Sequence, residues 1–317
     1  MKPVLCLKSG CSRPAALLAT GEPRMLCREH GADGKAPTLK PYYERNGITI
    51  YHADCRDVLP LLPAVDMGLT SPPYGEIRQY VDYSPLDMTD VIGLLVECLM
   101  PGGVLMWNEA DQVIDGSESG ASFRHALYAM QCGLRLHDTM IYCREGVTFP
   151  DNNRYHPAFE YMFVFSKGAP RCFNGIQDRR NLRAGEKMHG TQRERDGSVK
   201  HISQMGKIAA EYGLRLNWWV LKSASQETPG PHEHPARMPF RMAKDHIITW
   251  SNPSETILDP FMGSGTTLVA AKQLGRKAIG IEIEEKYCRI AVERLEATTP
   301  PLALEFTPER GSQEVLL

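Results

Sequence analysis

The sequence has no long hydrophobic run and almost no net charge. Its richest apolar stretch, residues 91–107, is interrupted by Glu97 and by the Pro-Gly-Gly triplet at 101–103, whereas a membrane-spanning helix needs about 18 or more consecutive apolar residues. The amino terminus lacks the apolar core of about seven or more residues that a secretory signal carries. The formal net charge is −2, so any nucleic-acid partner would be bound by a local basic patch. We therefore expect a cytoplasmic protein with no membrane partner.

The sequence also lacks the features of a disulfide-stabilised protein. Its nine cysteines are an odd number scattered along 317 residues, and no export signal accompanies them, so we expect reduced thiols or metal ligands. A hydrophobic fraction of 42% and a charged fraction of 23% are those of an ordinary globular protein. The length suggests about two domains.

Short β-like runs alternate with amphipathic helical runs between residues 47 and 297. Strands are expected at 48–51, 66–70, 104–107, 136–143, 159–165, 256–258 and 277–283, and helices at 55–62, 89–99, 122–132, 266–274 and 284–297. This alternation predicts an α/β fold with a mostly parallel sheet covered by helices. The interval 171–215 interrupts it with few large apolar residues and an excess of Lys and Arg, which indicates an exposed, basic insert. Residues 298–317 are expected to form a loosely attached tail.

The first 40 residues form a separate Cys/His-containing segment with little apolar periodicity. Cys6, Cys11, Cys27 and His30 offer four ligands, enough for a closed tetrahedral zinc site. The segment has too few large apolar residues to fold around a core, so a bound zinc ion would serve as that core. Unligated thiols are the alternative, because the first Cys pair is more widely spaced than in most zinc modules.

A glycine-rich turn follows the expected strand at 256–258. Glycines there let backbone N–H groups approach a ligand, and the N-terminus of the next helix favours a carboxylate or a phosphate. The turn has no Lys after its second Gly, and G-x-G-x-x-G is absent, so it matches neither common phosphate motif. Glu282, at the end of the next strand, is placed where an acidic side chain accepts both hydroxyls of a ribose. Together these features indicate a site for an adenosine-bearing cofactor.

A second motif, Ser71-Pro72-Pro73-Tyr74, directly follows an apolar run. Two prolines fix the backbone and remove two donors, so the turn presents its carbonyls between a hydroxyl and an aromatic ring. Such a turn is suited to binding an amino group. A rigid loop that ends a strand is the alternative interpretation.

The two motifs together resemble a family, the DNA methyltransferases that use S-adenosylmethionine to methylate an exocyclic amino group of a base. Their chain order, with S-P-P-Y before D-P-F-x-G-S-G-T-T, resembles the circularly permuted β class of that family. The resemblance implies a Rossmann-like methyltransferase domain over 47–297. This domain would comprise a catalytic half (47–167), a target-recognition insert (168–233) and a cofactor-binding half (234–297).

The resemblance also implies which residues form the site. The catalytic residues would be Ser71, Pro72, Pro73 and Tyr74. The cofactor-binding residues would be Asp54, Cys55, Thr70, His234, Pro235, Arg237, Pro239, Asp259, Pro260, Phe261, Gly263, Ser264, Gly265, Thr266, Thr267, Glu282 and Ile283. Among these, Asp54 would bond the adenine amino group and Glu282 the ribose. Phe261 would pack on the methionine portion, whose carboxylate would be bonded by the hydroxyls and amides of Thr266 and Thr267.

The implied substrate is double-stranded DNA with the target base flipped out of the helix, which costs a few kcal/mol. Tyr155 and His156 would line the base pocket, although an aromatic residue at a strand end often belongs to the core. The residues of the insert that would contact DNA are Arg179, Arg180, Arg183, Lys187, Arg193, Arg195 and Lys200. A homodimer and a link to restriction-modification are further expectations from the family.

The identity of the base and some competing functions stay open. Serine at position 71 resembles the cytosine-N4 enzymes and slightly favours that base, whereas adenine-N6 enzymes usually carry Asp or Asn there. A catalytically dead DNA-binding protein on this fold is one competitor, and methylation of RNA or of a protein glutamine is another. Methylation at carbon 5 of cytosine is excluded, because that chemistry uses a Cys next to Pro and no Pro-Cys pair occurs in the chain.

Overall fold

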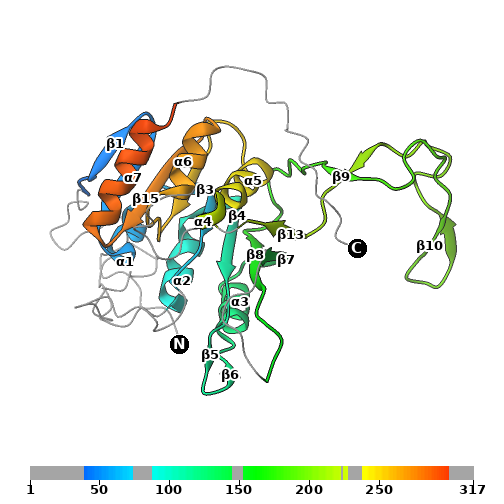
Figure 1. Cartoon of the computed structure of the whole chain (residues 1–317), viewed down its shortest axis with the longest axis horizontal. Helices are drawn as coiled ribbons and strands as arrows, with labels where there is room; N and C mark the ends of the chain where they lie inside the picture. Colours follow the sequence, from blue (N-terminus) through cyan, green and yellow to red (C-terminus); the bar gives the residue numbers. More distant parts are fainter. Residues whose placement is uncertain (1–38, 74–87, 145–152, 223, 228–237, 300–317) are drawn as a thin grey trace, which may run out of the picture. The chain divides into compact units, whose positions relative to one another are not determined.

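The computed structural model describes residues 39–73, 88–144, 153–222, 224–227 and 238–299 (Figure 1). Several residues with predicted roles lie outside these ranges: Cys6, Cys11, Cys27, His30, Tyr74, His234, Pro235 and Arg237.

The core of the fold is a nine-stranded sheet. In sheet order its strands are β1 (Tyr43–Arg45), β2 (Ile48–His52), β15 (Lys277–Glu282), β14 (Thr256–Asp259), β3 (Val65–Thr70), β4 (Leu99–Glu109), β8 (Phe159–Ser166), β7 (Arg135–Arg144) and β13 (Trp218–Leu221). The neighbours from β2 to β4 are all parallel, and β8 runs antiparallel to both β4 and β7. The predicted α/β fold with a mostly parallel sheet is therefore confirmed.

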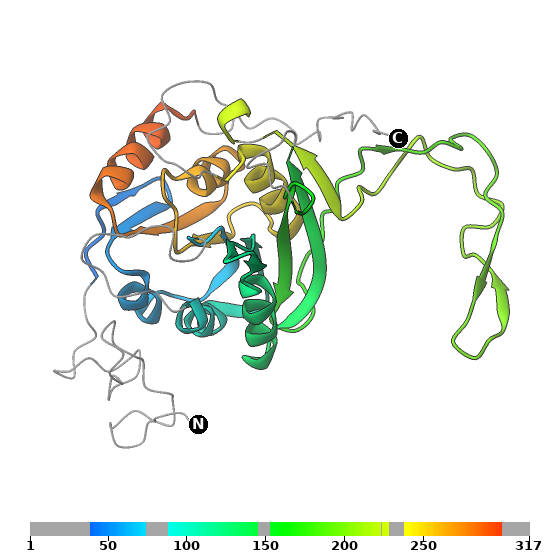
Figure 2. The ribbon, with the colours of Figure 1, turned by 60° about the horizontal axis from the view of Figure 1, so that its bottom comes forward.

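Helices cover both faces of this sheet. One face packs against α5 (Phe240–Trp250), α6 (Thr266–Gln273) and α7 (Glu285–Ala297), and the other against α1 (Cys55–Val58), α2 (Met88–Cys98) and α3 (Ala121–Gln131). These two groups of helices lie on opposite sides of the strands in Figure 2. Within the described residues, no helix combines the length and the apolar character needed to cross a membrane.

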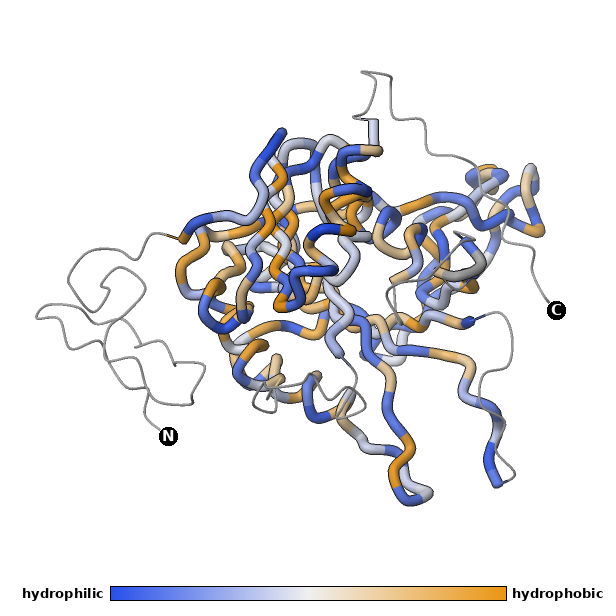
Figure 3. Tube along the Cα trace, turned by 60° about the vertical axis from the view of Figure 1, so that its left-hand side comes forward, coloured by the Kyte–Doolittle hydropathy of each residue, from blue (hydrophilic) through white to orange (hydrophobic). Residues whose placement is uncertain are grey.

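Side-chain alternation along the strands explains the three layers. In β14, Ile257 joins the apolar cluster under α5, α6 and α7, whereas its neighbour Leu258 joins the cluster on the opposite face. Successive side chains of a strand point to opposite faces, and a strand covered on both faces becomes a continuous apolar run. Figure 3 colours each residue by hydropathy, and apolar residues, in orange, recur along the chain.

The strands and helices match the prediction except at a few places. The expected helix at 55–62 is α1 followed by a 3₁₀ turn, Leu59–Leu61, which contains Pro60. Strand β4 begins at Leu99 rather than at residue 104, because the Pro-Gly-Gly triplet forms a bulge instead of ending the strand. At this bulge Gly102 has φ 78°, and its N–H donates to the Lys167 carbonyl at 2.7 Å. Two strands of the main sheet, β1 and β13, were not predicted.

Contacts divide the chain into two compact units, and the second contains residues 175–217. Strand β13, which falls within the predicted insert 168–233, is a strand of the main sheet. Within this unit, β9 (Arg179–Arg180) pairs with β12 (Tyr212–Gly213), and β10 (Thr191–Arg193) pairs with β11 (Val199–His201). The Arg215 guanidinium forms a buried ion pair with Asp178, with Nε to Oδ1 at 3.0 Å. This pair joins the two ends of the unit.

Elsewhere, β5 (Val113–Ile114) and β6 (Ser117–Glu118) form a short hairpin, and α4 is Ala224–Glu227.

Candidate functional site

The candidate site lies where the carboxyl ends of β14 and β3 meet. From β14 the chain continues through α6 to β15 on one side, and from β3 through α2 to β4 on the other. The direction of the connections thus reverses between β14 and β3. Open α/β sheets bind their ligands outside the carboxyl ends of the strands at such a point.

A hydrogen bond across this point joins the two sequence motifs. The Thr70 hydroxyl, at the end of β3, donates to Asp259 Oδ1 at the end of β14 over 2.8 Å. The Thr267 hydroxyl donates to Asp259 Oδ2 at 2.6 Å, and the backbone N–H of Phe261 donates to Oδ1 at 3.1 Å. Burial raises the pKa of Asp259 to about 6, although the two hydroxyls oppose that rise. Because Ser71 is the next residue after Thr70, this carboxyl group holds the serine turn beside the glycine-rich turn.

The glycine-rich turn is braced from α7. Gly265 precedes α6 with φ 78°, and a Cβ at this position would lie 2.7 Å from the Cβ of Ala291. Arg294 of α7 donates from one guanidinium nitrogen to the Ser264 carbonyl at 2.5 Å and to the Thr266 hydroxyl at 3.2 Å. The turn and the start of α6 are therefore fixed against a neighbouring helix. The sequence alone gave no indication of this role for Arg294.

Glu282, at the end of β15, closes the other side of the turn. Its Oε2 accepts the N–H of Gly263 at 3.0 Å, and its Oε1 accepts the N–H of Glu284 at 2.9 Å. Burial, with a smaller contribution from the charge of Asp259, raises the pKa of Glu282 to about 7. The two carboxylate oxygens together have four lone pairs, so the backbone amides do not exhaust their capacity to accept hydroxyl groups.

The end of β2 lies beside the end of β15. His52 is paired with Glu282 in the parallel register, and the N–H of Ala53 donates to the Glu282 carbonyl at 3.1 Å. The His52 ring Nε2 lies 3.1 Å from the Ile283 carbonyl. Asp54 follows as the N-cap of α1, and its carboxylate accepts the N–H of Arg56 at 2.8 Å. The structure thus brings the predicted adenine and ribose residues to adjacent strand ends.

Cys55 is placed differently from its neighbour Asp54. Its side chain is buried in the apolar cluster under α1 and α2, and burial raises the pKa of the thiol. Any contact between this residue and a cofactor would come from its backbone.

Ser71 is hydrogen-bonded from the other direction by Asn108 of β4, which in turn bonds Glu160 of β8. Asn108 Nδ2 lies 3.3 Å from Ser71 Oγ and 2.6 Å from Glu160 Oε2. The Arg144 guanidinium lies 3.6 Å from Glu160 Oε1. Neither Asn108 nor Glu160 was among the predicted site residues. The available signal was a polar residue near the end of a largely apolar strand, the carboxyl end of β4 for Asn108 and the amino end of β8 for Glu160.

The other predicted residues are distributed around this edge. Pro72 and Pro260 are buried, and Pro73 is half-buried. Pro239 is the N-cap of α5. Tyr155 is 98% exposed and His156 is also exposed, on the segment that leads into β8.

The predicted DNA-contacting residues all lie in the second unit. Arg183 pairs with Glu186 at 2.7 Å on the surface, and Arg179 Nε donates to the Leu214 carbonyl at 3.0 Å. Lys187 forms an isolated β-bridge with Ile208. The remaining predicted DNA-contacting residues are exposed: Arg180, Arg193, Arg195 and Lys200.

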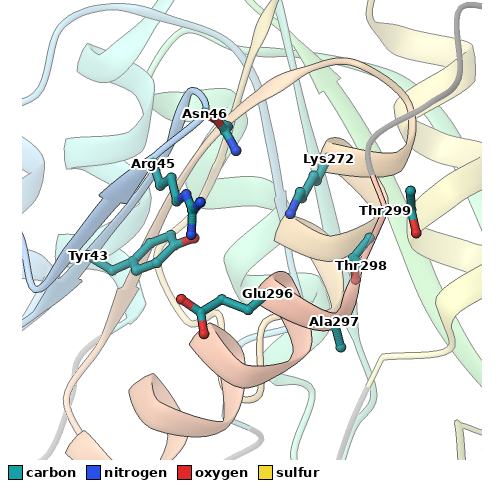
Figure 4. A pocket seen from close by; sticks show the side chains of 8 residues that line it. All are labelled: Tyr43, Arg45, Asn46, Lys272, Glu296, Ala297, Thr298 and Thr299. Atoms are coloured by element: carbon teal, nitrogen blue, oxygen red, sulfur yellow. The ribbon is translucent and has the colours of Figure 1, made fainter.

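A cavity of about 330 Å³ lies away from these residues (Figure 4). Its lining comes from the β1–β2 turn and the ends of α6 and α7: Tyr43, Arg45, Asn46, Lys272, Glu296, Ala297, Thr298 and Thr299. The turn precedes the start of β2, so the cavity lies at the amino ends of the parallel strands, opposite the candidate site. Across the part of the chain that the structure describes, no group of three or more His, Cys, Asp and Glu side chains could hold a metal ion.

Comparison with known proteins identifies the family to which this chain belongs. A family model described as DNA methylase, for the N6 and N4 enzymes, matches residues 65–293. The chain is 44% identical over 237 residues to the orphan methyltransferase M.BamHII of Bacillus amyloliquefaciens, covering 73% of this chain and 88% of that protein.

Solved structures share the fold. The PvuII DNA methyltransferase, described as cytosine-N4-specific, matches with a TM-score of 0.58 and 17% identity, covering 80% of this chain and 88% of that one. The M1.HpyAVI complex with SAM matches with a TM-score of 0.53 and 21% identity, covering 78% and 98% of the two chains. Both likenesses extend to nearly the whole of the known chain.

Proposed function

This chain belongs to the N6/N4 DNA methylase family, and we propose that it transfers a methyl group from S-adenosylmethionine to an exocyclic amino group of a base in duplex DNA. The observation that carries the proposal is the bond between Thr70 and Asp259, which holds Ser71 beside the glycine-rich turn. A methyl donor on that turn and an acceptor at the serine would be neighbours. Holding two reactants in place supplies much of the rate of such a transfer.

The residues at the strand ends fit S-adenosylmethionine. Glu282 would accept the ribose hydroxyls, and Asp54 would accept the adenine amino group, since both carboxylates stand at adjacent strand ends. The turn around Gly263 and Gly265 leads into the N-terminus of α6, where backbone N–H groups favour the methionine carboxylate. When bound, this cofactor supplies an electrophilic methyl group on a sulfonium. Phe261 would pack against the methionine portion, and the segment with His234, Pro235 and Arg237 would close over it.

The serine turn would prepare the acceptor. The amino group of a base delocalises its lone pair into the ring, so it is a poor nucleophile. Hydrogen bonds from that amino group to the Ser71 hydroxyl and the Pro72 carbonyl would draw the nitrogen toward tetrahedral geometry. Tyr74 would stack on the base, and Tyr155 or His156 would contact its other side. The base must leave the duplex to reach this turn.

We favour N4 of cytosine as the target, with N6 of adenine as the alternative. Serine rather than Asp or Asn at position 71 supports cytosine. The structural likeness to a cytosine-N4-specific enzyme concerns the fold and does not identify the base, because the two sequences are 17% identical.

The exposed cations of the insert would bind the DNA backbone. Arg193, Arg195 and Lys200 lie on or between the strands of one hairpin, β10 and β11, and a two-stranded ribbon fits the major groove of B-DNA. Their charges would release counterions from phosphates, so binding would weaken as salt rises. A structural zinc ion on Cys6, Cys11, Cys27 and His30, and a homodimer, stay predictions from the sequence.

Nucleoside mass spectrometry of DNA from cells that express the protein tests the proposal. We expect N4-methylcytosine in DNA, absent from cells that express the Ser71→Ala variant at the same level. N6-methyladenine instead would establish the alternative base. Unmodified DNA from cells with soluble protein would favour a DNA-binding protein without catalysis.

A further inference from the structure

Two buried polar side chains stand behind Ser71 on the neighbouring strands β4 and β8. Asn108 of β4 is 2% exposed and Glu160 of β8 is 9% exposed. Their strands are hydrogen-bonded neighbours, with Asn108 opposite Met162. A buried polar group destabilises a fold unless its hydrogen bonds are satisfied, so these two residues are costly at positions where an apolar residue would pack.

The chemistry of the pair fixes the orientation of the amide. The Glu160 carboxylate lies beside the Arg144 guanidinium and accepts hydrogen bonds. The side-chain atom of Asn108 that lies 2.6 Å from Glu160 Oε2 must therefore be the amide nitrogen. The same nitrogen lies 3.3 Å from Ser71 Oγ. Ser71 thus accepts a hydrogen bond from Asn108, whose amide is in turn held by Glu160.

We propose that Asn108 and Glu160 are positioning residues for Ser71. The proposal rests on the function proposed above, in which the Ser71 hydroxyl holds the target amino group. Glu160 orients the amide of Asn108, and Asn108 selects the rotamer in which the serine oxygen faces its substrate. An amide nitrogen is not a base, so Glu160 acts on Ser71 through orientation and takes no proton from it. One accepted bond does not exhaust the two lone pairs of a serine oxygen.

A double-mutant cycle tests whether Asn108 acts through Ser71. The assay measures the single-turnover rate of tritiated methyl transfer from saturating S-adenosylmethionine to unmethylated duplex DNA. We expect Asn108→Ala to slow transfer by about 10- to 100-fold, because a misplacement of roughly 1 Å costs about 100-fold. In the Ser71→Ala background the same substitution should cost less than about 2-fold, since residues that act through one another are non-additive. Asn108→Leu, which keeps the volume, replaces the alanine variant if that variant does not fold.

Two substitutions of Glu160 separate orientation from general stability. Glu160→Gln keeps an oxygen that can accept from Asn108, so its rate should stay within about 3-fold of wild type. Glu160→Ala removes the acceptor and should slow transfer as Asn108→Ala does. In each folded variant the affinity for S-adenosylmethionine, measured by calorimetry, should be unchanged.

The outcomes distinguish the two proposals. An equal loss from Asn108→Ala in both backgrounds, or equal losses from the two Glu160 variants, would overturn the positioning role alone. A wild-type protein that transfers no methyl group, or a Ser71→Ala variant as fast as wild type, would overturn the proposed function itself.

Discussion

Removing the hydroxyl of Thr70 should destabilise the fold in a pH-dependent way. Thr70→Val keeps the shape of a side chain that is 0% exposed and deletes its bond to Asp259. A hydrogen bond to a charged group contributes about 1.5–3 kcal/mol, and a neutral one about 0.5–1.5 kcal/mol. Burial raises the pKa of Asp259 to about 6, so the group is mostly charged at pH 8 and mostly neutral at pH 5.

The sign follows from the pKa of Asp259. The Thr70 hydroxyl lowers this pKa against the effect of burial, so the valine variant should have a higher folded-state pKa than wild type. A carboxyl group whose pKa is higher in the folded state than in the unfolded state binds more protons when folded. The free energy of unfolding therefore falls as the pH rises toward the folded-state pKa. The variant should therefore lose free energy of unfolding relative to wild type by about 2 kcal/mol at pH 8 and by about 1 kcal/mol at pH 5.

Urea unfolding of wild type, Thr70→Val and Thr70→Ser at both pH values measures this difference. Thr70→Ser keeps the hydroxyl and is the matched control, with no such pH dependence expected. Equal destabilisation of the valine variant at pH 5 and pH 8, or less than about 0.5 kcal/mol at pH 8, would refute the reasoning that Asp259 joins the two motifs.

Three further predictions concern the cofactor turn and the insert. Because burial raises the pKa of Glu282 to about 7, calorimetry should show the affinity for S-adenosylmethionine rising from pH 6 to pH 8. Glu282→Gln should abolish that rise, and a rise that persists in the variant would contradict the ribose assignment. Gly265→Ala should destabilise the fold by about 1–3 kcal/mol in thermal or urea unfolding, because its φ is +78° and the new Cβ would meet Ala291. The control Gly93→Ala, in helix α2 with open space around its Cβ, should stabilise by about 0.5–1 kcal/mol, and equal effects of the two would contradict the strain argument. Lys200→Ala should reduce the slope of log affinity for DNA against log salt by about 1, and an unchanged slope would remove Lys200 from the DNA contacts.

The sequence predicted those parts of the fold that depend on local pattern. Alternating and continuous apolar runs made the parallel strands predictable. A strand covered on both faces has apolar residues at successive positions, as Ile257 and Leu258 are in β14. The pattern failed where neighbours override local preference. Gly102 and Gly103 predict a break, but the pairing of β4 with β3 and β8 accommodates them as a bulge. The short strand β13 is defined by its pairing with β7, which no local pattern predicts.

Some residues of the candidate site could likewise be assigned from the sequence, and others could not. Glu282 was assigned to the cofactor from its spacing after the glycine-rich turn, and Asp259 from the resemblance of the motif that contains it. Asn108 and Glu160 were not assigned, since their relation to Ser71 depends on which strands lie side by side in the sheet. Arg294 is likewise separated from the turn it braces by a strand and a helix.

The most direct test of the central claim is transfer of a tritiated methyl group from S-adenosylmethionine to duplex DNA, compared between wild type and Ser71→Ala. The wild-type protein should place the label on an exocyclic amino group of a base, and the variant should lose at least about 100-fold in rate while its affinity for the cofactor is unchanged. Label on RNA or protein instead of DNA, or a Ser71→Ala variant that keeps the wild-type rate, would contradict the account.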